Sequence, residues 1–264
     1  MNTQDSRQNQ FLQGTTALIT GAGSGIGRGI ALALAAAGAN VVVTARRAAT
    51  GEETLALIKQ EGGKGIAVEM DVTKRADVDR GISQTVSHFG GLDILVHNAN
   101  ASGDSALPVK LEDIDEALWD SQARVSWDGA FHCMQAAFPH LKASPRGRVV
   151  ILGSCFGLHG AAMNPTYAAL KGGDRGLVKS LAREWGPYGI TVNAIEPASA
   201  TEPTKVFFSQ NPALEKAYLR NFSMRRMGDP RADIGRAIVA LCSDEFGYIT
   251  AQSIQVDGGL YTAL

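Results

Sequence analysis

Thr20-Gly21-Ala22-Gly23-Ser24-Gly25-Ile26-Gly27 is the stretch that decides the fold class of this chain. Residues 16–20, immediately before the glycines, are apolar and β-branched, which is typical of a buried strand. Residues 25–37 are small and mostly apolar and predict a helix. The sequence therefore predicts a strand, a glycine-rich turn and a helix in direct succession.

The glycines have separate roles in such a turn. Gly21 permits a tight exit from the strand, Gly25 leaves room for the backbone to approach a phosphate, and Gly27 lets the helix pack closely on the sheet. The N–H groups at the start of a helix favour an anion, and the Ser24 hydroxyl adds a donor. We interpret the turn, with Ile26 inside it, as the phosphate site of a dinucleotide. A glycine-rich turn that serves packing alone is the alternative.

The alternation of strands and helices continues along the rest of the chain. Continuous apolar runs such as Val149-Val150-Ile151-Leu152 are typical of strands covered on both faces. The alternation indicates right-handed crossovers and a parallel sheet. The predicted fold class is α/β: a single doubly wound Rossmann-type domain with about seven parallel strands and helices on both faces. The later strands are expected at residues 40–44, 65–70, 94–97, 148–153, 190–195 and 253–256.

Length and composition favour one domain. The 264 residues are 45% hydrophobic and 19% charged, and no polar linker divides them. We expect residues 1–13 to form a flexible tail and residues 14–264 to form the NAD(P)-binding domain. Lys and Arg number 25 against 26 acidic residues, so charge provides no basis for binding nucleic acid.

Neither a signal peptide nor a long apolar run is visible, so no membrane association is expected. The cysteines Cys133, Cys155 and Cys242 lie far apart in the sequence and form no C-x-x-C pair. This pattern favours a reduced, cytoplasmic protein, and no metal site is expected.

The residues after the second predicted strand indicate which nucleotide is preferred. An NAD site normally has an acidic residue there for the ribose diol, whereas this chain has Arg46 and Arg47. An Arg fork can bind a 2′-phosphate in bidentate fashion. We therefore expect NADP(H) to be favoured over NAD(H), with Arg46 as the main contact; two solvated surface charges are the alternative.

Ser154, Tyr167 and Lys171 form a candidate group for proton transfer. Exchange of a hydride between a ketone and a secondary alcohol requires a proton donor or acceptor at the substrate oxygen. A phenol has a pKa of about 10, and a nearby ammonium group lowers it. Residues four apart on a helix share a face, so Tyr167 and Lys171 can act at one site.

With these residues in place, the chain resembles the short-chain dehydrogenase/reductase family in its ordinary-length branch. The resemblance extends over residues 14–259, with several motifs in the family's order. Its carriers are Thr20 to Gly27, Asp71-Val72, Asn98-Ala99, Gly153-Ser154, Tyr167 to Lys171, Val192-Asn193-Ala194-Ile195 with Pro197, and Val256-Asp257-Gly258-Gly259.

The resemblance implies roles for these residues. Tyr167 would be the general acid/base, Lys171 would lower its pKa and hold the nicotinamide ribose, and Ser154 would stabilise the substrate oxygen. The adenine would lie beside Asp71 and Val72. Asn98 and Ala99 would line the ribose of the cofactor. The segment that starts at Pro197 would face the nicotinamide.

Five positions depart from the family pattern. Ser126 replaces an Asn that holds a water in a proton relay to the lysine, and it is included in the catalytic group on that basis. Asn100 stands where the family has Gly, and its side chain is expected to narrow the cofactor floor. Ala198 and Ala251 stand where the family has Gly, the latter just before the last strand. Thr201 lies one residue earlier in the sequence than the family's Thr that contacts the cofactor amide.

Residues 201–226 occupy the place of the family's substrate lid and are rich in apolar side chains. With Phe156 and His159, lid residues Phe207 and Phe208 are expected to line the mouth of the site, which suits a small lipophilic carbonyl or alcohol. A lid helix that simply packs its apolar face on the domain is the alternative. By analogy with the family, a homo-oligomer, either a dimer or a tetramer, is also expected.

The predicted function is NADP(H)-dependent interconversion of a lipophilic ketone and a secondary alcohol. Two alternatives remain open at this point. One is a cofactor-binding protein of the same fold with impaired chemistry and a sensing or assembly role. The other is an enoyl or imine reductase that uses the same cofactor.

Overall fold

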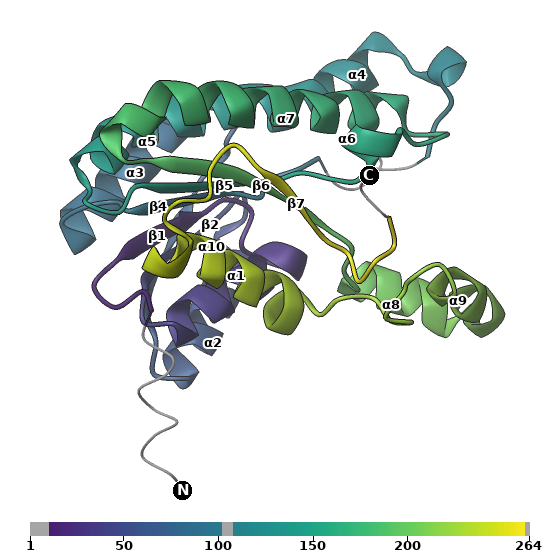
Figure 1. Cartoon of the computed structure of the whole chain (residues 1–264), viewed down its shortest axis with the longest axis horizontal. Helices are drawn as coiled ribbons and strands as arrows, with labels where there is room; N and C mark the ends of the chain where they lie inside the picture. Colours follow the sequence, from purple (N-terminus) through teal and green to yellow (C-terminus); the bar gives the residue numbers. More distant parts are fainter. Residues whose placement is uncertain (1–10, 102–107, 262–264) are drawn as a thin grey trace, which may run out of the picture.

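Seven parallel strands form the centre of the molecule in the computed structural model, which describes residues 11–101 and 108–261 (Figure 1). They form one sheet in the order β3-β2-β1-β4-β5-β6-β7. The predicted doubly wound α/β fold is thereby confirmed. The strands are β1 Thr16–Ile19, β2 Asn40–Ala45, β3 Lys64–Glu69, β4 Ile94–His97, β5 Arg148–Leu152, β6 Thr191–Pro197 and β7 Ser253–Val256.

The strand order reverses at β1, because β2 and β4 lie on opposite sides of it. Ile19 is paired in register with Val43 of β2 and with Val96 of β4. In open α/β sheets, a crevice forms at the carboxyl ends of the strands where the order reverses. The glycine turn, which leaves the carboxyl end of β1, therefore opens onto this crevice.

Helices cover both faces of the sheet (Figure 1). Ile19 packs into a core with helices α1, α2 and α10, whereas its neighbour Leu18 packs into the opposite core with α3, α5 and α7. Alternate strand residues point to opposite faces, so both faces of a central strand must be apolar. The helices are α1 Gly25–Ala36, α2 Ala48–Gln60, α3 Arg75–Phe89, α4 Glu116–Ala123, α5 Gly129–Ala143, α6 Phe156–His159, α7 Pro165–Trp185, α8 Glu202–Ser209, α9 Pro212–Leu219 and α10 Arg236–Cys242.

Several predicted boundaries shift by one or two residues in the structure, and two of these differences have a clear structural cause. The sixth strand begins and ends later than predicted, because pairing with β7 extends it to Pro197. Within the predicted tail, residues 1–10 lie outside the described residues. Leu12 is fully buried and its backbone N–H donates to the carbonyl of Ala37 at 3.0 Å, so ordered packing already includes part of that segment.

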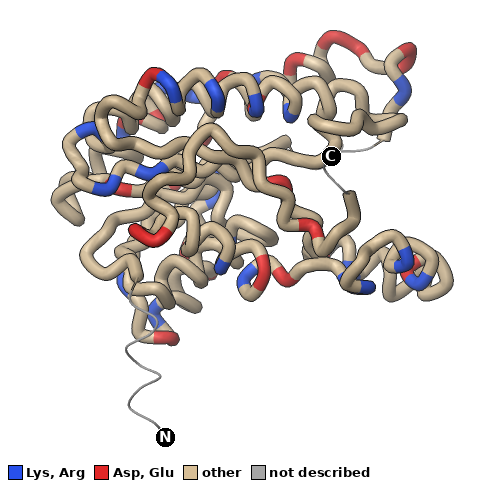
Figure 2. The backbone as a smooth tube through the Cα atoms, viewed as in Figure 1, with Lys and Arg blue, Asp and Glu red and all other residues tan. Residues whose placement is uncertain are grey.

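Helices α8 and α9 lie side by side beyond the carboxyl end of β6 and project from the body of the molecule (Figure 1). They form most of the segment that the sequence suggested as a lid. Among the described residues, no helix is long and apolar enough to cross a bilayer. Basic and acidic residues are interspersed along the described backbone (Figure 2).

Candidate active site

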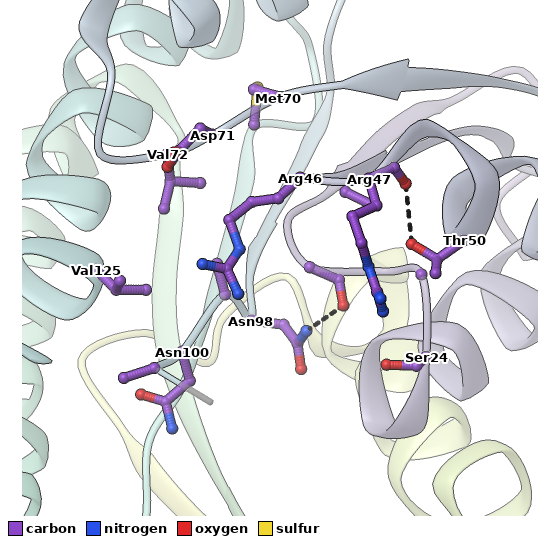
Figure 3. A pocket seen from close by; sticks show the side chains of 15 residues that line it. Ser24, Arg46, Arg47, Thr50, Met70, Asp71, Val72, Asn98, Asn100 and Val125 are labelled. Atoms are coloured by element: carbon purple, nitrogen blue, oxygen red, sulfur yellow. Dashed lines mark hydrogen bonds between the residues drawn. The ribbon is translucent and has the colours of Figure 1, made fainter. Parts of the chain in front are cut away.

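A cavity of about 700 Å³ lies at the carboxyl ends of β1, β2 and β4 (Figure 3). It has the size of a small-molecule site. Of the predicted cofactor residues, the cavity is lined by Gly21, Ser24, Arg46, Arg47, Asp71, Val72, Asn98 and Ala99. Gly25, Ile26 and Gly27 begin helix α1 beside it, whereas Tyr167, Lys171 and Pro197 lie outside its lining.

The glycine turn is held in a conformation that other residues avoid. Gly21 and Gly25 have φ angles of +64° and +54°, in the left-handed region. A Cβ on Gly27 would lie 2.4 Å from the carbonyl oxygen of Gly21 and 2.5 Å from Nδ2 of Asn98. The turn therefore requires glycine for close packing as well as for backbone angles.

Thr20 and Asn98 fasten the turn to the neighbouring strand. The Asn98 side-chain amide donates to the carbonyl oxygens of Thr20 at 2.9 Å and Gly21 at 3.1 Å. In return, Oγ1 of Thr20 accepts from the backbone N–H groups of Asn98 and Ala99, each at 2.9 Å. Asn98 thus has a structural role that the sequence did not reveal, because its partners lie nearly eighty residues earlier.

Arg46 and Arg47 follow β2 directly, and both side chains extend into the cavity (Figure 3). The Arg47 guanidinium lies toward Ser24 of the glycine turn, whereas the Arg46 guanidinium points toward the middle of the cavity, between Val72 and Asn98 (Figure 3). Thr50, which the sequence reasoning missed, donates to the carbonyl of Arg47 at 2.9 Å. A Cβ on Gly23 would lie only 2.5 Å from Oγ1 of Thr50. Thr50 therefore packs against the glycine turn and fixes the path of the chain between the turn and the two arginines.

Asp71 and Val72 form the opposite wall (Figure 3). Oδ1 of Asp71 accepts from both the backbone N–H and the hydroxyl of Thr73, at 3.0 and 2.8 Å. This fixes the carboxylate in place at the end of β3. A Cβ on Gly129 would lie 2.7 Å from Val72, so helix α5 supports this wall closely.

These groups fit a dinucleotide. The cavity combines a helix N-terminus, two guanidinium groups and a fixed carboxylate, which suit phosphates, a 2′-phosphate and an adenine amino group respectively. Among the described residues, no three His, Cys, Asp or Glu side chains converge in a way that suits a metal ion.

Ser154 and Tyr167 lie on the far side of β4, where β5 ends and α7 begins. Ser154 is 9% exposed, and its Oγ accepts from the backbone N–H of Phe156 at 3.2 Å. The Phe156 ring meets the Tyr167 ring edge to face, with 6.2 Å between centroids. Phe156 therefore contacts both residues, Ser154 through its backbone N–H and Tyr167 through its ring.

Lys171 lies one turn after Tyr167 on α7 and is 4% exposed. Its Nζ donates to the carbonyl of Leu152 at 2.7 Å and lies 5.9 Å from the centroid of the Tyr167 ring. Tyr167 and Lys171 thus lie on one face of α7, as their spacing predicts. The lysine also donates to Asp174 at 3.0 Å, a partner that the sequence reasoning did not identify.

Ser126 and Asn100, two of the departures from the family pattern, face each other. Oγ of Ser126 lies 3.4 Å from Oδ1 of Asn100. Ser126 is buried in a turn of π-helix, residues 124–128, that precedes α5. His97 is also buried, and burial together with the charge of Lys171 lowers its pKa to about 3. His97 is therefore a neutral group of the interior.

The remaining predicted substrate residues have different environments. Phe208 is buried and stacks on Tyr218 of α9 at 5.5 Å, whereas Phe207 is 51% exposed. His159 is exposed and stacks on Tyr261 at 4.6 Å. Thr201 is the first residue of the lid segment, and its Cγ2 would lie 3.6 Å from a Cβ on Gly25. The lid segment thus begins against the glycine turn.

Comparisons with known proteins agree with this geometry. A family model described as enoyl-(acyl carrier protein) reductase matches residues 21–261. The chain is 33% identical to glucose 1-dehydrogenase 2 of Bacillus subtilis, over 94% of this chain and 95% of that one. It is 36% identical to the 3-oxoacyl-[acyl-carrier-protein] reductase FabG of Staphylococcus epidermidis, over 93% and 98% of the two chains.

A solved structure is similar as well. It is described as a short-chain alcohol dehydrogenase from Sinorhizobium meliloti, with a TM-score of 0.87 and 39% identity over 95% of this chain and 98% of that one. The chain therefore belongs to the short-chain dehydrogenase/reductase family of oxidoreductases.

Proposed function

We propose that the protein is an NADP(H)-dependent oxidoreductase that interconverts a lipophilic ketone and a secondary alcohol. The observation that carries this proposal is the group of side chains where β5 ends and α7 begins. In this group, Ser154 and the Tyr167 ring both contact Phe156, and the Lys171 ammonium lies 5.9 Å from the centroid of the Tyr167 ring. The names of the relatives, a glucose 1-dehydrogenase and a 3-oxoacyl-[acyl-carrier-protein] reductase, support chemistry at C=O and CH–OH.

The nicotinamide cofactor supplies or accepts the hydride when it is bound. In the reducing direction, the Tyr167 hydroxyl donates a proton to the carbonyl oxygen of the substrate, and the Ser154 hydroxyl donates a hydrogen bond to the same oxygen. In the oxidising direction, the tyrosinate accepts the alcohol proton. The Lys171 ammonium favours the tyrosinate, because an opposite charge nearby stabilises the ionised form.

The preference for NADP(H) rests on Arg46 and Arg47. Both lie at the carboxyl end of β2 and extend into the cavity, and among the described residues that line it the one carboxylate is that of Asp71 on the opposite wall. In the proposed complex, the guanidinium groups bind the 2′-phosphate and Asp71 binds the adenine amino group.

The lipophilic class of substrate rests on the lid at residues 201–226. Phe207, Leu214 and Met224 are exposed on it, and each is at least 50% accessible. Apolar side chains beside a site with few polar groups suit a lipophilic compound. We also propose that the protein is a cytoplasmic homo-oligomer, a dimer or tetramer, of one domain at residues 14–264.

The proposed activity can be tested with a panel of ketones of increasing size, assayed with NADPH and with NADH at the absorbance of the reduced nicotinamide. We expect the greatest kcat/KM for lipophilic ketones, and at least about tenfold greater efficiency with NADPH. Tight NADPH binding without turnover on any carbonyl would contradict the proposal and support a binding role.

A second candidate is reduction of an enoyl C=C bond, which the description of the matching family model favours. Product analysis with a deuterated nicotinamide separates the two. Deuterium on a carbinol carbon supports ketone reduction, and deuterium on a saturated carbon next to an intact carbonyl supports enoyl reduction.

A further inference from the structure

Asp174 is a buried carboxylate in contact with the lysine of the catalytic group. It lies three residues after Lys171 on α7 and is 2% exposed. Its Oδ2 accepts from Nζ of Lys171 at 3.0 Å. Its Oδ1 is buried and has no hydrogen-bond partner within the described residues. The only polar contact of this side chain in that part of the molecule is therefore the catalytic lysine.

The pair is enclosed by close packing. A Cβ on Gly157 of α6 would lie 2.4 Å from the backbone of Lys171, and a Cβ on Gly173 would lie 3.0 Å from the Trp127 ring. Nε1 of Trp127 donates to the carbonyl of Leu170 at 3.2 Å, which fixes the indole against this turn of α7. Charges in such an enclosed place interact more strongly than charges in water.

Lys171 has three N–H donors, and two have partners in the structure: the carbonyl of Leu152 and the carboxylate of Asp174. One donor is left for a cofactor ribose hydroxyl. The titratable groups facing the lysine are Tyr167 and Asp174 on its own helix and His97 on β4. His97 is neutral, so the Asp174 carboxyl is the acidic group that faces the ammonium; burial raises the pKa of Asp174, and the charge of Lys171 beside it opposes that rise. Glu184 is the other titratable residue of the groove between α5 and α7 that Asp174 adjoins.

We propose that Asp174 is a positioning residue of the catalytic group, which fixes the Lys171 ammonium and sets the pH at which the Tyr167–Lys171 pair loses its first proton. The expected effect on the pH dependence of turnover rests on the proposed function. The effect on proton loss from Tyr167 can be measured without any substrate. The first proton is assigned to the pair and not to one residue, because the phenol ring and the ammonium lie close together.

The sign follows from charge. The fully protonated pair carries one positive charge, and the carboxylate of Asp174 stabilises it. Replacing that carboxylate with a neutral amide removes the stabilisation, so the first proton leaves at lower pH. The same direction holds whether the proton comes from the phenol or from the ammonium. Alcohol oxidation requires the singly deprotonated pair, so its activity should begin at lower pH in the variant.

The test compares Asp174→Asn, Asp174→Ser and Asp174→Glu with the unaltered protein. The first readout is the ¹³Cζ signal of Tyr167 in labelled protein without cofactor or substrate, assigned by its loss in Tyr167→Phe. We expect both neutral variants to move the first inflection down by about 1 pH unit, and Asp174→Glu to retain it. Asp79→Asn, which removes a carboxylate from an exposed ion pair on α3, should cause no shift.

An unchanged inflection in a folded neutral variant would overturn the inference, as would an upward shift. If neither neutral variant folds while Asp174→Glu does, the carboxylate is a requirement of folding and the inference also fails. The second readout is the pH profile of kcat/KM for alcohol oxidation. A protein that oxidises no alcohol refutes the proposed function, whereas the ¹³C titration still decides the role of Asp174.

Discussion

The cofactor cavity and the catalytic group lie along the carboxyl edge of one sheet, but they are built from different materials. The cavity combines the backbone of a glycine turn and a helix N-terminus with side chains at strand ends, such as Arg46 and Asp71. The catalytic group consists of side chains from β5 and α7, held by buried contacts such as Lys171 with Leu152. Substitutions in the first region should therefore alter binding, whereas those in the second should alter turnover.

Tyr167→Phe should separate the two regions most clearly. It removes the proton donor, and we expect turnover to fall about 10²-fold or more. NADPH affinity, measured by fluorescence titration, should change by less than about twofold because the ring and its contact with Phe156 remain. Near-native turnover would show that the phenol is not the acid/base.

Gly27→Ala should damage the cavity. Its Cβ would collide with Gly21 and Asn98, so we expect a loss of about 1–3 kcal/mol in unfolding free energy and weaker NADPH binding. Urea denaturation and NADPH titration measure these effects. Gly176→Ala on α7 is the control, because a Cβ there meets nothing within 4 Å and a helical alanine should stabilise by up to about 1 kcal/mol. Equal effects at both positions would refute the packing argument.

Arg46→Ala should change cofactor preference without changing the fold. Loss of a charge-assisted contact should weaken NADPH binding by about tenfold or more and leave NADH binding nearly unchanged. Isothermal titration with both nucleotides measures this difference. Arg183→Ala, on the exposed side of α7, should affect neither nucleotide. Equal losses for NADPH and NADH would contradict the assignment of the 2′-phosphate to Arg46.

Ala251→Gly should produce the smallest effect and lies outside both regions. Ala251 has a φ angle of +63°, so glycine should stabilise the protein by about 1 kcal/mol and leave kcat unchanged. Thermal unfolding measures the gain. The same substitution at Ala56, an exposed residue inside helix α2, should destabilise by a similar amount. A loss of stability at residue 251 would show that its side-chain packing outweighs its backbone strain.

Much of the fold was predictable because its signals are local. The glycine turn and the apolar strands can be identified in short windows, and the structure confirms the strands they predict, with shifts at the ends. Strand boundaries were less predictable, because the end of β6 depends on pairing with β7, about sixty residues later. Ala251 is a further example. The sequence shows that it replaces a Gly of the family pattern, but only the structure shows its positive φ angle.

Side-chain roles that depend on partners far away in the sequence could not be predicted from the sequence. Asn98 appeared to be a ribose contact, and its bonds to the glycine turn became visible only once β1 and β4 lay side by side. Phe207 and Phe208 are adjacent and chemically equal, yet one is exposed and the other is buried against α9. Asp174 had no motif to distinguish it from an ordinary helical carboxylate.

The sequence by itself determined the class of fold, the dinucleotide turn and the residue types of the catalytic group, because periodicity and the conformational freedom of glycine act over a few residues. Only the tertiary structure decided which charges share an enclosed space, as Lys171 and Asp174 do. Burial and the distance between two atoms control how strongly charges interact, and both are properties of the packed chain.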